Sequence, residues 1–288
     1  MHIPRVLLRD DKAWAEPPPC EVALERDAAR HLIQVLRLKA GHRLRVFDGH
    51  GSEFDAVLID ASRHTPRLII EANIYPDTTP KLLLELIIGV PKADAMDWIV
   101  QKSVELGIRS LRPLLLTRSR SHGEHRMIER RHEHWQAVIV SAAEQCGRNE
   151  LPILHRPMTL TEMLSDLPPP SDRDIRVAAM LPAERLGIST ETIQSSSSRA
   201  ESKIESASLA APSKNGPCPR TFETGIQIAR AAVGPEGGIH PEEAQELVSV
   251  GEFQPASLGP RTLRCETAAV VLLDRLQVCF GDGANSDA

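Results

Sequence analysis

The chain has 288 residues, and its 34 Lys and Arg against 39 Asp and Glu give a formal net charge of −5. This acidic balance excludes a polycationic protein that coats nucleic acid through bulk charge, although it leaves room for a local basic surface. Hydrophobic residues make up 41% of the chain and aromatic residues only 3%. These values exclude a fully disordered chain and argue against RNA recognition dominated by base stacking.

The N-terminal region alternates short apolar stretches with turn residues. Asp48-Gly49 lies between two such stretches, which is typical of a β-hairpin. We therefore predict a small β-rich domain over residues 1–76, followed by a linker at 75–80. Its expected elements are a helix over 27–38 and strands over 43–47, 54–59 and 67–72.

From residue 77 to 288 strands and helices alternate, which predicts an α/β domain with a largely parallel sheet. The nearly continuous apolar run 82–90 is typical of a strand covered on both faces, and it is too short to span a membrane. The expected strands are 82–90, 111–116, 176–181, 226–233 and 253–258, and the expected helices lie between Asp94 and Gly107, over 127–146, from Pro241 onward and over 266–280.

A serine-rich segment interrupts this pattern. Nine of the 25 residues from Ser189 to Ser213 are serine, and few are large and apolar. Such a composition buries too little surface to offset the entropy of ordering, so we expect a flexible insertion at about 189–219.

Two glycine-containing loops are candidates for ligand binding. Val233 to Gly238 (VGPEGG) follows a strand, and glycines at the carboxyl end of a strand let the backbone approach a ligand. Read alone, this loop is equally a tight strand-to-helix turn. Leu258 to Ala268 (LGPRTLRCETA) runs into the last helix. Capping of that helix accounts for Glu266 and Thr267, but it leaves Arg261 and Arg264 unexplained, and these would favour an anion.

Basic residues concentrate between Arg109 and Trp135, where the sequence has seven arginines and only three glutamates. A local excess of this kind is the footprint of phosphate contacts, although a charge run is more often a solvated helix face. Lys92, at the end of a strand, is a further candidate for contact with a polyanion. The five scattered cysteines never form a C-x-x-C pair and no secretory signal is present, so we expect reduced thiols, no metal site, no membrane contact and a cytoplasmic location.

Together these motifs resemble the SPOUT methyltransferases, and more narrowly the bacterial ribosomal RNA small-subunit methyltransferase E family. The resemblance rests on Val233–Gly238 and Leu258–Ala268. It extends to residues 31–37 with Gly41, to 48–51, to 92–107, to Arg118-Ser119 and to 143–148. It covers the chain except for the serine-rich segment.

The resemblance implies a trefoil-knotted SPOUT α/β methyltransferase domain with an N-terminal PUA-like β-barrel domain for RNA binding. It also implies a homodimer and S-adenosyl-L-methionine as cofactor. The residues that it places around the cofactor are Leu181, Pro182, Gly234, Pro235, Glu236, Gly237, Gly238, Leu258, Gly259, Leu263, Arg264, Thr267 and Ala268. The segment that contains Leu181 and Pro182 departs from the family pattern and adjoins the serine-rich segment.

The implied activity is methylation of N3 of a uridine in 16S rRNA of the small ribosomal subunit. The uracil N3 proton must leave or the developing anion must be stabilised, so we expect Arg264 to stabilise charge and Glu144 or Glu266 to orient the site or relay a proton. The RNA contacts are expected from Arg5, Arg9, His31, Arg37, Lys92, Arg118, Arg120 and Arg148. The alternatives are another SPOUT reaction, such as 2′-O-ribose methylation, and a non-catalytic RNA-binding or ribosome-assembly protein.

Overall fold

The computed structural model describes residues 3–9, 17–24, 29–62, 65–74, 80–119, 125–180 and 225–281. It separates into two compact units, Met1–Thr79 with Ile139–Leu151, and Pro80–Val138 with Pro152–Ala288. The domain boundary expected after residue 76 and the serine-rich insertion at about 189–219 lie outside the described residues, as do Leu181, Pro182 and Arg120.

The first unit contains a five-stranded sheet with the order β1-β3-β4-β5-β2. Its β1 pairs with β3 in parallel and its other pairs are antiparallel. The hairpin expected around Asp48-Gly49 is confirmed, since Asp48 Oδ1 accepts from the backbone N–H groups of His50 at 2.7 Å and Ser52 at 3.0 Å. The strands are β1 (Arg5–Leu7), β2 (Cys20–Ala23), β3 (Arg43–Phe47), β4 (Glu53–Asp60) and β5 (Arg67–Ile74).

One apolar core holds this unit together. The two edge strands contribute Val6 and Val22 to it, the central strands contribute Leu44 and Leu58, and Leu32 packs on it from η2 (Arg30–Val35). The segment expected as a helix over 27–38 is therefore a single π-helical turn in its described part. The edge strands escaped prediction because three or four residues are too few for a visible alternation.

The second unit is built on a six-stranded, wholly parallel sheet with the order β11-β9-β10-β6-β7-β8. The α/β architecture expected from the sequence is confirmed. Strand order and pairing do not decide how the chain threads, so the trefoil knot stays a prediction. The strands are β6 (Leu83–Gly89), β7 (Ser110–Leu114), β8 (Ile153–Leu154), β9 (Asp174–Ala179), β10 (Ile228–Val233) and β11 (Gln254–Ala256).

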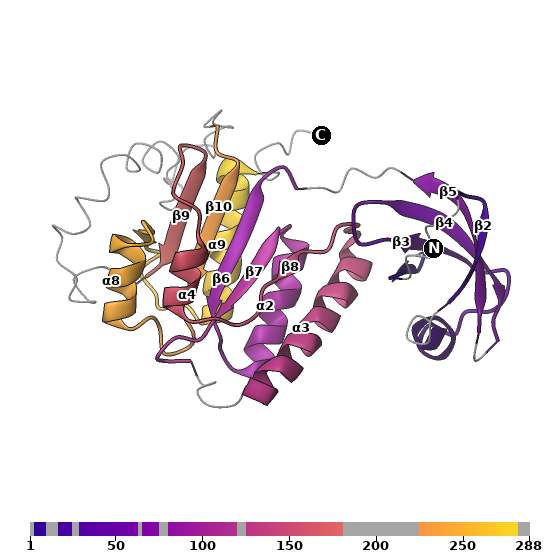
Figure 1. Cartoon of the computed structure of the whole chain (residues 1–288), viewed down its shortest axis with the longest axis horizontal. Coiled ribbons are helices and arrows are strands. Elements are labelled where there is room, and N and C mark those ends of the chain that lie inside the picture. The colour runs from indigo at the N-terminus through magenta and orange to yellow at the C-terminus, as the bar shows by residue number, and fades with distance from the viewer. Residues whose placement is uncertain are drawn as a thin grey trace. The chain divides into compact units, whose positions relative to one another are not determined.

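Helices cover both faces of this sheet (Figure 1). On one face α2 (Ala93–Glu105) packs against α9 (Cys265–Phe280), which also contacts β6 and β10. On the other, α4 (Leu160–Asp166) and α8 (Pro241–Ser249) share an apolar core with the strands. The helix α3 (His125–Cys146) crosses from one unit to the other. No helix in the described ranges is long and apolar enough to cross a membrane.

Charged side chains form a buried layer within the second sheet. Glu85 on β6 accepts hydrogen bonds from Arg112 Nε on β7 at 2.6 Å and from Arg230 Nε on β10 at 2.9 Å. Arg230 also contacts Asp174 on β9, which Arg176 Nε reaches at 3.0 Å. Buried charges of this kind are tolerated only when they are paired and hydrogen-bonded. The layer therefore links β7, β6, β10 and β9 through paired side chains.

Candidate functional site

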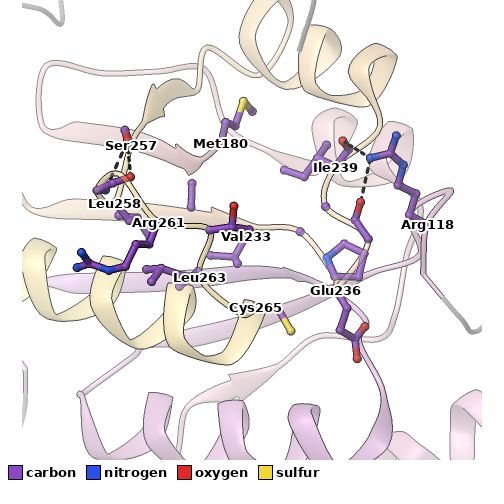
Figure 2. A pocket seen from close by; sticks show the side chains of 18 of the residues that line it. Arg118, Met180, Val233, Glu236, Ile239, Ser257, Leu258, Arg261, Leu263 and Cys265 are labelled. Carbon is purple, nitrogen blue, oxygen red and sulfur yellow. Dashed lines mark hydrogen bonds between the residues drawn. The ribbon is translucent and has the colours of Figure 1, made fainter. Parts of the chain in front are cut away.

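The carboxyl ends of the parallel strands meet at one edge of the second sheet. The register aligns Val233 of β10 with Ala179 of β9 and Ile88 of β6, and Ala256 of β11 with Ala179. The loops after these strands therefore emerge side by side, at the edge where open α/β sheets bind ligands. They enclose a cavity of about 520 Å³, called here the strand-end cavity (Figure 2).

The loop from Gly234 to Gly238 forms one wall of the strand-end cavity, and close packing requires glycine at Gly234. A Cβ atom on Gly234 would lie 2.7 Å from Ile239 Cγ1 and 2.9 Å from the Ile239 nitrogen. Gly238 has φ of +72°, which favours glycine. Gly89 at the end of β6 is equally crowded, since its Cβ would lie 2.5 Å from Pro235 Cδ. The start of this loop is thus packed closely against Ile239 and the end of β6, with no space for a side chain at Gly234.

Arg118 holds this loop from the side of β7. Its NH1 donates to the carbonyl oxygens of Gly237 at 2.9 Å and Ile239 at 3.4 Å, as Figure 2 shows. Next to it, the N–H and hydroxyl of Thr117 donate to Glu243 Oε1 at 2.7 and 2.9 Å. The side chain of Glu243 also accepts from the His240 N–H at 3.1 Å, where it closes the capping box of α8. The loop after β7 and the start of α8 are therefore fastened together around the glycines.

The loop from Ser257 to Leu263 forms the opposite wall of the cavity and leads into α9. Gly259 has φ of +124°, a backbone conformation that favours glycine. Ser257 Oγ donates to the Gly259 carbonyl oxygen at 3.3 Å, which closes the turn. Cys265 and Ala268 of the first turn of α9 complete the lining.

A second hollow, called here the side cavity, adjoins the first and has a volume of about 790 Å³. Glu236, Thr262, Leu263 and Cys265 line both cavities. The residues that line the side cavity alone are Lys92, Asp94, Ala95, Trp98, Arg264 and Glu266. The strand-end cavity and the side cavity are thus neighbouring sites that share one wall.

Cys265 lies in this wall as a neutral thiol. Burial, together with the hydrogen bond and charge of Glu266 and the charge of Glu236, raises the pKa of the Cys265 thiol to about 12. Its Sγ donates to Glu266 Oε2 at 3.2 Å. A thiol with this pKa is protonated at neutral pH and is no nucleophile. The wall therefore offers hydrogen bonding and charge, without covalent chemistry at the cysteine.

The structure sorts the residues expected around the cofactor into the two cavities. Those that line the strand-end cavity are Gly234, Pro235, Glu236, Gly237, Gly238, Leu258, Gly259, Leu263 and Ala268. Arg264 lines the side cavity, and Thr267 lines neither. Sequence reasoning missed Met180 and Ser257 as lining residues, although each directly follows a strand whose carboxyl end was expected at this edge.

The three residues expected to act in catalysis do not lie in one unit. Arg264 and Glu266 line the side cavity, where Arg264 NH1 lies 3.9 Å from Glu266 Oε1 and the Arg264 side chain is 87% exposed. Glu144 belongs to the first unit, where its Oε1 accepts from the Leu7 N–H at 3.2 Å. The structure thus assigns Glu144 a contact that fastens the end of α3 to β1.

The residues expected to contact RNA differ in exposure. The Arg5 guanidinium is hydrogen-bonded within the first unit, where it donates to Glu53 Oε1 at 2.8 Å and to the Ala143 carbonyl at 2.7 Å. Its side chain is only 8% exposed. Arg148 is buried as well. Arg9, Arg37, Lys92 and Arg118 are exposed. The side chain of His31 and all of Arg120 lie outside the described residues.

Comparison with known proteins places this architecture among RNA methyltransferases. Residues 78–277 match the model of an RNA methyltransferase domain, and residues 24–71 match that of an RNA methyltransferase PUA domain. The ribosomal RNA small subunit methyltransferase E of Synechocystis is 31% identical over 88% of this chain and 72% of its own.

Two solved structures resemble the whole chain. The ribosomal RNA small subunit methyltransferase E of Neisseria gonorrhoeae, bound to S-adenosyl methionine, superposes with a TM-score of 0.75 at 26% identity, covering 98% of this chain and 99% of its own. A putative methyltransferase of Legionella pneumophila, in complex with the same cofactor, gives a TM-score of 0.75 at 25% identity, covering 98% of this chain and 100% of its own.

Proposed function

Because the chain belongs to the RNA methyltransferase family, in the group named ribosomal RNA small subunit methyltransferase E, we propose that it methylates N3 of a uridine in 16S rRNA with S-adenosyl-L-methionine as methyl donor. The observation that carries the proposal is the strand-end cavity, which adjoins a second cavity along a common wall. A transferase with two substrates needs two such sites in contact.

The strand-end cavity fits S-adenosylmethionine. Its volume of about 520 Å³ lies within the range of small-molecule sites. The backbone of Gly234, Gly237 and Gly238 on one wall and of Leu258 and Gly259 on the other would hold the cofactor, since these residues line the cavity and glycines leave their peptide groups uncovered. When bound, the cofactor supplies an electrophilic methyl group, whose transfer forms the N3–C bond and leaves the electrons of the broken C–S bond on sulfur.

The protein then has to manage the N3 proton and the charge of the uracil ring. Arg264 and Glu266 are the candidates among the residues expected for catalysis, because both line the side cavity. The Arg264 guanidinium stabilises negative charge on a uracil oxygen, and the Glu266 carboxylate accepts the N3 proton. Glu144 lies in the first unit, so we assign it a structural contact with β1.

The phosphate contacts belong to exposed basic residues, with Arg9 and Arg37 in the first unit and Arg118 in the second. Phosphate contacts of this kind make binding weaken steeply as salt rises. Arg5 and Arg148 are buried and are left out of the proposed contacts. The partner is the 16S rRNA of the small ribosomal subunit, which places the protein in the cytoplasm, and the assembly proposed from the family is a homodimer.

Methyl transfer from labelled S-adenosylmethionine tests the proposal. The full chain is incubated with 16S rRNA, with small ribosomal subunits and with tRNA, and the labelled RNA is digested to nucleosides for mass spectrometry. The expected product is N3-methyluridine from 16S rRNA or from the subunit. A 2′-O-methylated nucleoside would replace the proposal by the ribose reaction, and cofactor binding without transfer to any RNA would support a non-catalytic RNA-binding protein.

A further inference from the structure

We propose that the side cavity recognises the imide edge of uracil, with Lys92 and Arg264 as hydrogen-bond donors and Glu266 as the acceptor between them. This inference rests on the proposed function and adds to it the site of the base and a role for Lys92. The expected role of Lys92 was contact with a phosphate. Its position in the side cavity, beside the wall shared with the cofactor site, assigns it to the base instead.

The wall shared by the two cavities indicates where the base that accepts the methyl group lies. Glu236, Thr262, Leu263 and Cys265 line both cavities, so a base in the side cavity and a ligand in the strand-end cavity meet there. Methyl transfer requires the two reacting atoms to approach to about 3 Å. Trp98 adds a broad apolar surface to the side cavity, because the residue is 41% exposed although the other large apolar residues of α2 are buried.

The chemistry of the lining matches uracil in particular. The imide edge of uracil presents oxygen, N3–H and oxygen, an acceptor–donor–acceptor pattern that requires a donor–acceptor–donor partner. Lys92 and Arg264 can only donate, and the Glu266 carboxylate can only accept. Cytosine presents a bare N3 and an amino group, so its N3 would meet the carboxylate without a proton between them. A site built on hydrogen bonds discriminates against a mismatched edge, because its polar groups are then left unpaired in the complex.

The other charged groups that face the side cavity leave these three side chains available. Glu236 Oε1 accepts from the Lys92 N–H at 2.9 Å, which holds that oxygen at the start of α2. Asp94 lies in the first turn of α2, where the N-terminal end of the helix favours its charge. Cys265 donates to Glu266 Oε2, so Oε1, 3.9 Å from Arg264 NH1, is left to accept from N3–H. Glu266 takes the N3 proton, and the electron pair that the N–H bond leaves on N3 then forms the new bond to the methyl carbon, while the electrons of the broken C–S bond stay on sulfur.

Nucleotide binding tests recognition without the reaction. The intrinsic fluorescence of the full chain is titrated with uridine 5′-monophosphate and with cytidine 5′-monophosphate, and Trp98→Phe identifies the part of the signal that comes from Trp98. Wild type is expected to respond to the uridine nucleotide at concentrations about tenfold lower than to the cytidine nucleotide. Lys92→Met is expected to lose this preference. Equal responses in the wild type would overturn the proposal.

Methyl transfer tests the same residue in the reaction. At saturating cofactor, Lys92→Met is expected to slow transfer to 16S rRNA about tenfold or more, with a deficit that shrinks as rising pH deprotonates N3 in solution. Cofactor affinity stays within about twofold, since Lys92 does not line the strand-end cavity. Lys102→Met, on the same helix but paired with Glu105 at 2.8 Å, is the matched control and keeps wild-type activity.

The two proposals fail in different ways. If the wild type forms N3-methyluridine and Lys92→Met does so at an unchanged rate, the role of Lys92 is wrong and the proposed function stands. If the wild type binds the cofactor and methylates no RNA, the proposed function is wrong, and the nucleotide titration still decides whether the side cavity prefers uracil.

Discussion

The carboxylate of Glu236 accepts a hydrogen bond from the backbone N–H of Lys92 at 2.9 Å, although 144 residues separate the two in the sequence. Figure 2 shows the Glu236 side chain extending away from the strand-end cavity that its own backbone helps to line. One residue thus belongs to the glycine loop through its main chain and to the start of α2 through its side chain. We infer that Glu236 is a positioning residue, which keeps Lys92 in place beside the cofactor loop.

This role predicts a difference between two substitutions of Glu236. Glu236→Ala removes the acceptor and is expected to slow methyl transfer about tenfold, because Lys92 loses its fixed place. Glu236→Gln keeps an acceptor oxygen and is expected to retain activity within about threefold. Steady-state kinetics with 16S rRNA separates the effects on kcat and KM. Equal losses in both variants would show that the charge of Glu236 matters and not its hydrogen bond.

Gly234 provides a direct test of the strand-end cavity. Gly234→Ala would place Cβ 2.7 Å from Ile239 Cγ1, so the loop must shift and cofactor affinity is expected to fall at least about tenfold. Calorimetry with S-adenosylmethionine measures the change. Gly41→Ala is the control, since Gly41 has φ of +90° but no atom within 4 Å of the added carbon. It is expected to cost about 1 kcal/mol of stability with unchanged cofactor affinity. An unchanged affinity for Gly234→Ala would place the cofactor elsewhere.

Much of the fold follows from sequence patterns that are local. The apolar run expected over 82–90 is β6, and the helix expected over 266–280 begins one residue earlier as α9. The helix α4 was missed, although Thr159 and Glu162 form a capping box whose spacing is visible in the sequence. Its seven residues are too short for the periodicity on which the other helices were recognised.

Of the candidate site, only the two loops could be predicted from the sequence. The two glycine-containing segments were recognised by composition, and both line the strand-end cavity. The roles of charged residues were not predictable, because they depend on partners far away in the chain. Arg5 reads as a basic residue near a terminus, but the structure buries it against Glu53 and the end of α3. Arg118 reads as part of a basic patch, and the structure adds a hydrogen bond from its guanidinium to the glycine loop.

Arg118 has two interpretations that one experiment separates. If Arg118 acts by holding Gly237 and Ile239, Arg118→Ala is expected to weaken cofactor binding about fivefold to tenfold, because two charged hydrogen bonds are lost. As a phosphate contact, its loss would leave cofactor binding unchanged and reduce the salt dependence of RNA binding. Calorimetry with the cofactor and RNA binding at two salt concentrations measure both. Arg130→Ala, an exposed position on α3, is the control for a general loss of positive charge.

The buried charged layer predicts a large loss of stability when Glu85 is neutralised. Glu85 accepts from Ser110 Oγ at 2.9 Å, from Arg112 and from Arg230. Glu85→Gln leaves two buried guanidinium groups with less compensating charge and is expected to cost about 3 kcal/mol. Urea unfolding measures the change. Glu105→Gln, which breaks the pair with Lys102 at the surface, is expected to cost less than about 1 kcal/mol. A similar small cost for Glu85→Gln would mean that the layer does not stabilise the sheet.

His155 at the edge of the same layer predicts a loss of stability in mild acid. Burial and the charge of Arg112 lower the pKa of His155 from its ordinary value of 6.5, and Glu85 and Asp166 only partly oppose this. Below pH 6.5 the unfolded chain therefore takes up a proton that the folded chain does not, and stability falls as the pH drops from there through the lowered pKa.

His155→Gln removes this titration, so the fall in Tm between pH 7.5 and 5.5 is expected to be smaller than in the wild type. His50→Gln, at an exposed position, is expected to leave the fall unchanged. The Arg112 hydrogen bond lowers the pKa of Asp166 from its ordinary value of 3.8, so protonation of Asp166 lowers the stability of the fold only in stronger acid. The two groups therefore act in separate pH ranges. A wild-type Tm that stays constant down to pH 5.5 would contradict the lowered pKa of His155.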